Sequence, residues 1–259
     1  MSKIGNAFKN GKAFIGFLTG GDPSIEKSCE YIMTMVKAGV DLVEIGIPFS
    51  DPIAEGVVIQ EANIRALSVN TRLEDVFRLA AMVRQQSDVP LVFLTYVNPI
   101  YKYGKDAFFA KCQENGVDGV IIPDMPFEER QECAGAAQAH GIDIISMIAP
   151  TSKDRIKEIA KVGSGFLYVV SSLGVTGTRS TITTNLKEII NTIKEVTDVP
   201  CAVGFGINMP KQAEKIAHDA DGVIVGSAIV KIIAKYGTEA APHIYEYVKA
   251  MKEAAMRGA

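Results

Sequence analysis

A single acidic side chain interrupts the apolar segment LVEIGI, residues 42–47. Glu44 lies there between Val43 and Ile45. A carboxyl group in such a setting either pairs with a buried cation or stays neutral with a raised pKa, ready to transfer protons. Few basic residues occur in the neighbouring apolar runs, which favours the second interpretation. Glu44 is therefore the first candidate for acid–base catalysis.

Two more acidic residues, Asp51 and Glu55, follow Glu44 on what reads as a loop. Acidic side chains on loops are usually solvated. Taken alone, neither residue is more strongly indicated as a functional group than as an ordinary side chain of a solvated loop.

Glycine-rich segments follow three of the later apolar runs. They read Gly174-Val175-Thr176-Gly177-Thr178, Gly204-Phe205-Gly206-Ile207 and Gly226-Ser227-Ala228. Glycine lets backbone N–H groups approach an anion closely, and a helix that begins at Ser227 would point its positive end at the same place. Tight turns also use glycine, so each segment alone is a weak signal. Together the three segments favour a phosphate site.

The sequence lacks the residues that several other kinds of catalysis require. The apolar runs contain no lysine that could form a Schiff base. The three histidines, His140, His218 and His243, fall outside these runs, and the cysteines are scattered, so no metal site and no Ser–His–Asp set is expected. Carboxylate acid–base chemistry on a small phosphorylated substrate remains.

The strands and helices that must position these residues follow a repeated sequence pattern. A helix-like stretch leads to a short turn, such as KAGVD, ENGVD or DAD, and then to an apolar run. Eight runs lie near residues 13–19, 41–47, 90–96, 118–124, 142–148, 165–171, 199–205 and 221–226. They are nearly continuous, which is typical of strands covered on both faces. Amphipathic stretches separate them, for example at 25–37, 73–86, 107–115 and 185–196.

Strict alternation of strand and helix predicts a parallel sheet, and eight units in about 250 residues predict a (β/α)8 barrel. We expect one domain over residues 1–259, with its chemistry at the carboxyl ends of the strands. The alternative is a doubly wound open sheet, but the first turn, TGGDP, lacks G-x-G-x-x-G. Helix starts are expected at Ser24 with Glu26, at Thr71 with Glu74, and at Pro210.

Composition narrows the class of protein. The chain has 259 residues, 47% of them hydrophobic and 22% charged, with a net charge of −3. A slightly acidic chain is not expected to bind nucleic acid or an anionic membrane. No apolar run approaches the roughly 20 residues of a membrane span, and no secretory signal is recognisable. Four scattered cysteines fit reduced thiols in the cytoplasm.

The sequence resembles a known family, the α subunit of tryptophan synthase. The segments that carry the resemblance are LVEIGIPFSDPIAEG, GFLTGGDP, LGVTGT, VGFGI and VGSAIVKII, in the family's order between about residues 3 and 254. The resemblance implies a (β/α)8 barrel that cleaves indole-3-glycerol phosphate to indole and glyceraldehyde 3-phosphate, with neither metal nor Schiff base. It also implies a β subunit that holds pyridoxal phosphate and assembles with this chain as α2β2.

The resemblance assigns roles to individual residues. Glu44 matches the proton-transferring glutamate, and Glu55 matches a second catalytic acid that is aspartate in many members. Val57 stands where the family usually has proline. The indole pocket is expected from Phe17, Leu94, Ile121, Tyr168 and Phe205. Phosphate is expected on Gly177, Gly206, Gly226 and Ser227.

Loops complete the expected site. The segment 172–184 resembles a lid over the phosphate, and its Thr176 matches a residue that contacts the loop of the second acid. The partner surface is expected at residues 48–57, 98–101 and 126–129. A solvated loop is the plain alternative for the lid.

Two alternatives to a conventional α subunit remain open from the sequence. One is an indole lyase that works without a β subunit. The other is a weakly catalytic, phosphate-binding partner that regulates a β subunit, a possibility raised by Glu55 and Val57. Related phosphate-binding barrels with other indole or anthranilate substrates usually carry a strand lysine, which this chain lacks.

Overall fold

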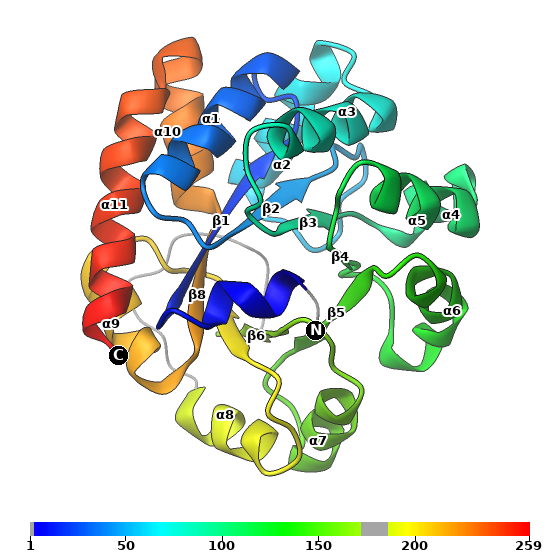
Figure 1. The fold of residues 1–259 in the computed structure, drawn as a ribbon, viewed down its shortest axis with the longest axis vertical. Helices are drawn as coiled ribbons and strands as arrows, with labels where there is room; N and C mark the ends of the chain where they lie inside the picture. The colour runs from blue at the N-terminus through cyan, green and yellow to red at the C-terminus, as the bar shows by residue number, and fades with distance from the viewer. Residues whose placement is uncertain (1–2, 172–185) are drawn as a thin grey trace.

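A computed structural model describes residues 3–171 and 186–259 of the chain. Its strands form one closed barrel in chain order, as the sequence predicts (Figure 1). All neighbouring strands are parallel, and β8 pairs with β1, which excludes the open sheet. Each strand lies inside a predicted apolar run. The strands are β1 (Ala13–Thr19), β2 (Leu42–Gly46), β3 (Leu91–Leu94), β4 (Gly119–Ile121), β5 (Asp143–Ile148), β6 (Leu167–Val170), β7 (Cys201–Gly204) and β8 (Gly222–Val225).

Helices surround the barrel and connect its strands (Figure 1). The α-helices are α1 (Ile25–Lys37), α2 (Val57–Ser68), α3 (Leu73–Arg84), α4 (Val97–Tyr103), α5 (Lys105–Glu114), α6 (Gln131–Ala139), α7 (Lys153–Lys161), α8 (Leu186–Lys194), α9 (Pro210–Asp219), α10 (Ser227–Tyr236) and α11 (Ala241–Arg257). Three 3-10 helices join them, η1 (Lys3–Phe8), η2 (Phe127–Glu129) and η3 (Gly237–Glu239). The expectation of a single domain over 1–259 stays a prediction.

Two of the three helix starts are where the sequence predicts them. The Ser24 hydroxyl caps α1 by accepting a backbone N–H of the first turn at 3.2 Å, and Pro210 is the first residue of α9. The prediction for α3 is wrong by one residue. Arg72, not Thr71, precedes the helix, and its N–H donates to the Asp75 carboxylate at 2.9 Å. Asp75, rather than the expected Glu74, is therefore the acidic residue that accepts a hydrogen bond from the backbone at the start of α3.

Side chains of the strands alternate between two apolar layers. Those that point into the barrel form an inner cluster with Ile15, Leu42 and Val92, and those that point outward pack against the helices. At the amino ends of the strands, η1 closes the barrel, because Ile4 is fully buried and the ring of Phe8 lies 5.9 Å from that of Phe166. The carboxyl ends of the strands, at the opposite end of the barrel, are therefore where a functional site is expected.

The aspartates of the repeated sequence pattern hold the amino ends of the strands in place. Asp41, Asp118 and Asp221 accept the backbone N–H of Phe14, Leu91 and Cys201 at 2.7, 2.9 and 2.8 Å. Each also pairs with a cation near the end of an outer helix, namely Lys252, Arg84 and Lys194. Each aspartate thus links its own strand to the preceding strand and to the helix layer.

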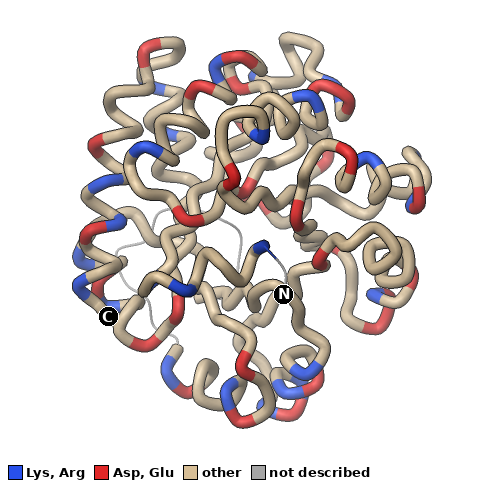
Figure 2. The backbone as a smooth tube through the Cα atoms, viewed as in Figure 1, with Lys and Arg blue, Asp and Glu red and all other residues tan. Residues whose placement is uncertain are grey.

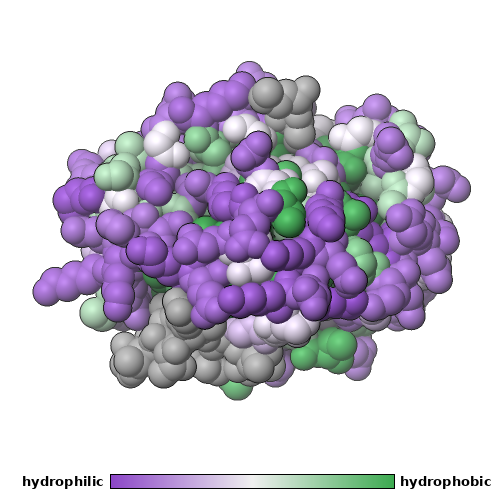
Figure 3. All heavy atoms as spheres, turned by 90° about the horizontal axis from the view of Figure 1, so that it is seen from below, coloured by the Kyte–Doolittle hydropathy of each residue, from purple (hydrophilic) through white to green (hydrophobic). Residues whose placement is uncertain are grey.

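The outer surface is mixed in charge. Acidic and basic residues alternate along the outer helices (Figure 2). The face on the side of α7 and α8 is mostly hydrophilic, with apolar side chains in separate spots (Figure 3). Among the helices described, none combines the length and apolarity needed to cross a membrane. Within 3–171 and 186–259, no group of three or more His, Cys, Asp or Glu is placed to hold a metal ion.

Candidate active site

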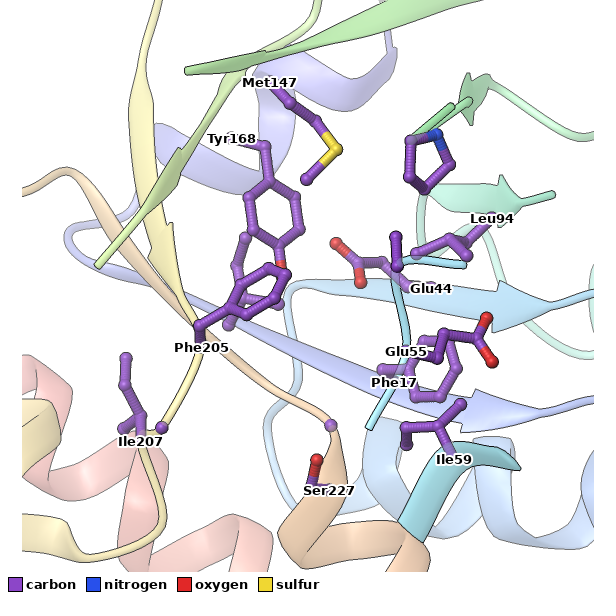
Figure 4. Close-up of a pocket in the computed structure, with 15 residues that line it drawn as sticks. Phe17, Glu44, Glu55, Ile59, Leu94, Met147, Tyr168, Phe205, Ile207 and Ser227 are labelled. Carbon is purple, nitrogen blue, oxygen red and sulfur yellow. The ribbon is translucent and has the colours of Figure 1, made fainter. Parts of the chain in front are cut away.

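A cavity of about 710 Å³, including space open to solvent, lies at the carboxyl ends of the strands. Every strand, or the loop after it, contributes a lining residue, and Figure 4 shows the labelled side chains converging on one space. The lining residues are Phe17, Glu44, Ala54, Glu55, Ile59, Leu94, Pro123, Met147, Tyr168, Phe205, Gly206, Ile207, Ile224, Gly226 and Ser227. Predicted acidic, apolar and glycine residues are therefore brought together.

Glu44 points into this cavity from β2, toward Tyr168 (Figure 4). The residue is 1% exposed, and its Oε1 has no hydrogen-bond partner among the described residues. No cation of the described chain forms an ion pair with it, so the sequence alternative of a buried ion pair is not what the structure shows. Burial alone raises the pKa of Glu44 to about 8. At neutral pH the side chain is mainly a protonated acid that can donate a proton.

Glu55 lies on the loop between β2 and α2 and is held differently. It is buried, and its Oε2 accepts a hydrogen bond from the Asn63 amide at 2.6 Å. Burial raises its pKa, while hydrogen bonds from Asn63 and Tyr96 lower it. The carboxyl group points away from Glu44 in Figure 4. The loop places this second acid at the cavity wall, in a tethered position.

Four of the five predicted indole-pocket residues line the cavity, namely Phe17, Leu94, Tyr168 and Phe205. The place of Ile121 in the indole pocket stays a prediction. Ile121 is fully buried in the inner cluster and does not line the cavity. Residues two apart in a strand face the same side, and Pro123, one step closer to the carboxyl end, lines the cavity.

Glycine and a helix start form another part of the cavity wall. Gly206, Gly226 and Ser227 all line it, and α10 begins at Ser227 as predicted. Gly206 has a φ of +79°, a conformation that favours glycine. The first N–H groups of a helix have no partner within the helix, and its dipole favours an anion there. Thr176, Gly177 and the expected lid at 172–184 lie outside the described residues.

Sequence reasoning missed the residues that hold Glu55. Asn63 is 3% exposed on the inner face of α2, with buried Ile59 one helical turn before it. A polar residue among the buried positions of a helix is the signal that could have found it. Tyr96 follows Leu94 by two residues, which indicates the same side of the sheet.

Comparison with known proteins identifies the family. A family model described as "Tryptophan synthase alpha chain" matches residues 5–256. The tryptophan synthase alpha chain of Lacticaseibacillus casei is 48% identical over 98% of this chain and 96% of its own length. The solved alpha chain from Legionella pneumophila has a TM-score of 0.89 at 33% identity, covering 98% of this chain and 97% of that one. A structure titled as the tryptophan synthase a2b2 complex of Pyrococcus furiosus matches with a TM-score of 0.83 at 33% identity, over 94% of this chain and 99% of that one. This chain therefore belongs to the tryptophan synthase alpha chain family.

Proposed function

We propose that this chain cleaves indole-3-glycerol phosphate to indole and glyceraldehyde 3-phosphate as the α subunit of a tryptophan synthase. The observation that carries the proposal is Glu44, a fully buried carboxyl group with no partner among the residues described, aimed into an otherwise apolar cavity. Family membership and the shape of the cavity support the same activity.

The substrate has three parts, and the cavity offers a place for each. The indole ring packs against Phe17, Leu94, Tyr168 and Phe205. The phosphate accepts N–H groups near Gly206, Gly226 and Ser227, with the positive end of α10 behind them. The glycerol chain lies between these ends, within reach of Glu44.

The reaction needs one group that both gives and takes a proton. Protonated Glu44 donates to indole C3, which places a positive charge on the indolenine ring. The Glu55 carboxylate accepts the ring N–H and stabilises that charge. Glu44, now ionised, removes the proton of the C3′ hydroxyl. The C3–C3′ bond breaks, its electron pair returns to the ring, and the C3′ oxygen becomes the aldehyde oxygen. Glu44 ends protonated, as it began.

Glu55 must turn for this step. Its carboxyl group is directed away from Glu44 and tethered to Asn63 in the present structure (Figure 4). Rotation of a side chain on a loop is a small movement. A carboxylate accepts hydrogen bonds at both oxygens, so Oε2 can keep its bond to Asn63 while the other oxygen accepts the substrate N–H. The tether holds Glu55 at the cavity wall and leaves it within reach of the ring.

The partner in this proposal is a β subunit, with pyridoxal phosphate in that subunit and a cytoplasmic location for the complex. Large apolar side chains are exposed on the expected partner surface. Ile53 is 73%, Val57 66% and Tyr101 42% exposed. Apolar residues this accessible in the loop beside Glu55 are typical of an interface. The solved a2b2 complex of Pyrococcus furiosus has an α chain of the same fold.

The test is release of glyceraldehyde 3-phosphate from indole-3-glycerol phosphate, measured with a coupled dehydrogenase, with and without a β subunit. We expect slow turnover alone and faster turnover with the partner. Fast turnover without the partner would assign the chain as an independent indole lyase. Binding of glycerol phosphate without turnover, together with activation of the β subunit, would assign the regulatory role instead.

A further inference from the structure

A second cavity lies beside β5, and its wall also includes residues that follow β4 and residues of η2 and α7. Figure 1 shows the positions of β5 and α7. It measures about 850 Å³, including space open to solvent. Most of its wall is apolar, with Ile122, Met125, Phe127 and Ile159 among the lining residues. Met147 lines both this cavity and the active-site cavity, so one strand separates the two.

Two buried polar groups line this second cavity. The Ser146 hydroxyl and the Nε of Arg130 have no hydrogen-bond partner among the residues that the structure describes. Ser146 is 7% exposed and lies on the outer face of β5, between Ile144 and Ile148. A buried donor left without an acceptor costs free energy, so each group favours a ligand that supplies one.

The guanidinium group of Arg130 forms no ion pair among the described residues, although Asp143 acts on it electrostatically. Its one side-chain hydrogen bond in the described chain is a long one, from Nη2 to the Ile144 carbonyl at 3.4 Å. Burial lowers its pKa, and Asp143 opposes this shift. Asp143 lines a neighbouring cavity together with Arg130, and its own Oδ2 has no hydrogen-bond partner among the described residues. The other cation of the second cavity, Arg155, is already paired with Glu128.

We propose that the second cavity binds a small molecule with an apolar body and one carboxylate. The Nε–H of Arg130 and the hydroxyl of Ser146 donate to the carboxylate, and the apolar body packs against Ile122, Phe127 and Ile159. A carboxylate accepts several hydrogen bonds at once and matches the planar guanidinium group, which suits it to both donors. This site is independent of the proposed cleavage reaction.

The experiment uses the whole chain labelled with ¹³C at the methionine methyl groups, titrated with 3-phenylpropionate and with its neutral analogue 3-phenylpropionamide. Met125 lines only the second of these cavities, whereas Met147 points into the active-site cavity. The variants Met125→Leu and Met147→Leu assign the two signals. We expect a saturable shift of the Met125 signal by the acid and binding of the amide at least tenfold weaker, because charged hydrogen bonds are the stronger ones.

A matched pair of serine variants tests the donor. Ser146→Ala should weaken binding of 3-phenylpropionate about tenfold. Ser164→Ala makes the same change in the wall of the neighbouring cavity and should leave binding unchanged. A Met125 signal that does not move at millimolar acid, a shift of Met147 alone, or equal binding of acid and amide would overturn the proposal. Equal weakening by both serine variants would overturn it as well. Because these readouts need no turnover, they are separate from the test of the cleavage reaction.

Discussion

Acidic residues at the two ends of the barrel differ in their partners. Asp41, just before β2, accepts the Phe14 N–H at 2.7 Å and pairs with Lys252 at 2.6 Å. Glu44, three residues further along the same chain segment, is buried with no partner among the described residues. Asp118 and Asp221 repeat the arrangement of Asp41 on other strands. The fold thus uses paired carboxylates to hold the strands and leaves an unpaired one in the cavity at their carboxyl ends.

The difference has an energetic meaning. A buried carboxylate without partners is far less stable than one in water, so the group avoids the charged state by staying protonated. Burial raises the pKa of Asp41 and Asp118, and their hydrogen bonds and cations oppose that shift. Nothing opposes the effect of burial on the pKa of Glu44, so ionisation of Glu44 destabilises the fold. Substitutions at the two ends should therefore have opposite effects on activity and on stability.

The largest expected effect is on catalysis. Glu44→Gln keeps the shape of the side chain but can neither donate nor accept the proton in transit. We expect kcat for cleavage of indole-3-glycerol phosphate to fall by about 10³-fold or more. The thermal midpoint should not fall, because the variant removes an unpaired acid. Retained turnover in steady-state assays would contradict the assignment of Glu44.

The converse substitution acts at the amino ends of the strands. Asp118→Ala removes the acceptor of the Leu91 N–H and of the Arg84 guanidinium. Because both donors are partly buried, we expect a loss of about 2–4 kcal/mol in the free energy of unfolding. In a thermal melt this corresponds to a midpoint lower by roughly 5–10 °C. The kcat of the folded enzyme should stay within about twofold, since ordinary changes away from the site leave the barrier intact.

An isosteric control sharpens this result. Asp118→Asn keeps an acceptor for the Leu91 N–H but loses the charge that pairs with Arg84, so its loss should be smaller. A fall in kcat as large as that of Glu44→Gln would show that the two ends are not separate in function.

The pH dependence of stability gives a third contrast. Glu44 has a pKa of about 8 in the folded chain, above its ordinary value of 4.5, so the folded state keeps a proton that the unfolded state has lost between these pH values. Stability from this group is therefore complete below about pH 4.5 and is lost as the pH rises to 8. Urea unfolding of the wild type and of Glu44→Gln should agree near pH 4.5. Above pH 8 the variant should be more stable, by about 5 kcal/mol, because a shift of about 3.5 pKa units corresponds to roughly 1.4 kcal/mol per unit. A difference that stays constant with pH would contradict the raised pKa.

The strands could be predicted because both of their faces are covered. Their nearly continuous apolar runs stand out from the amphipathic helices, so every strand lies within its predicted run. Helix α2 is harder to predict from the sequence, because apolar Val57 and Ile64 are exposed on it and obscure the amphipathic pattern. Because these side chains are so exposed, they contribute little to the packing of the barrel itself.

The site could be predicted only where a residue type conflicts with its surroundings. Glu44 in an apolar strand is such a conflict, and so is glycine repeated at the strand ends. Ile121 carries no such signal, because an isoleucine on the inner face of a strand fits core and cavity equally well. Its depth depends on where β4 ends and on Pro123 beyond it, which only the three-dimensional structure shows.

The smallest expected effect separates the two acids of the site from each other. Glu44 needs no partner, whereas Glu55 is oriented by Asn63 through a hydrogen bond of 2.6 Å. Asn63→Ala should lower kcat/KM about tenfold, the value of one hydrogen bond to a charged group. Because the Asn63 bond lowers the pKa of Glu55, the acid limb of the pH–rate profile should move to higher pH. In the background of Glu55→Gln the same substitution should cost little more, since a residue that acts through Glu55 has nothing left to orient. Independent, multiplying losses in this double-mutant cycle would show that Asn63 acts by another route, such as the packing of α2.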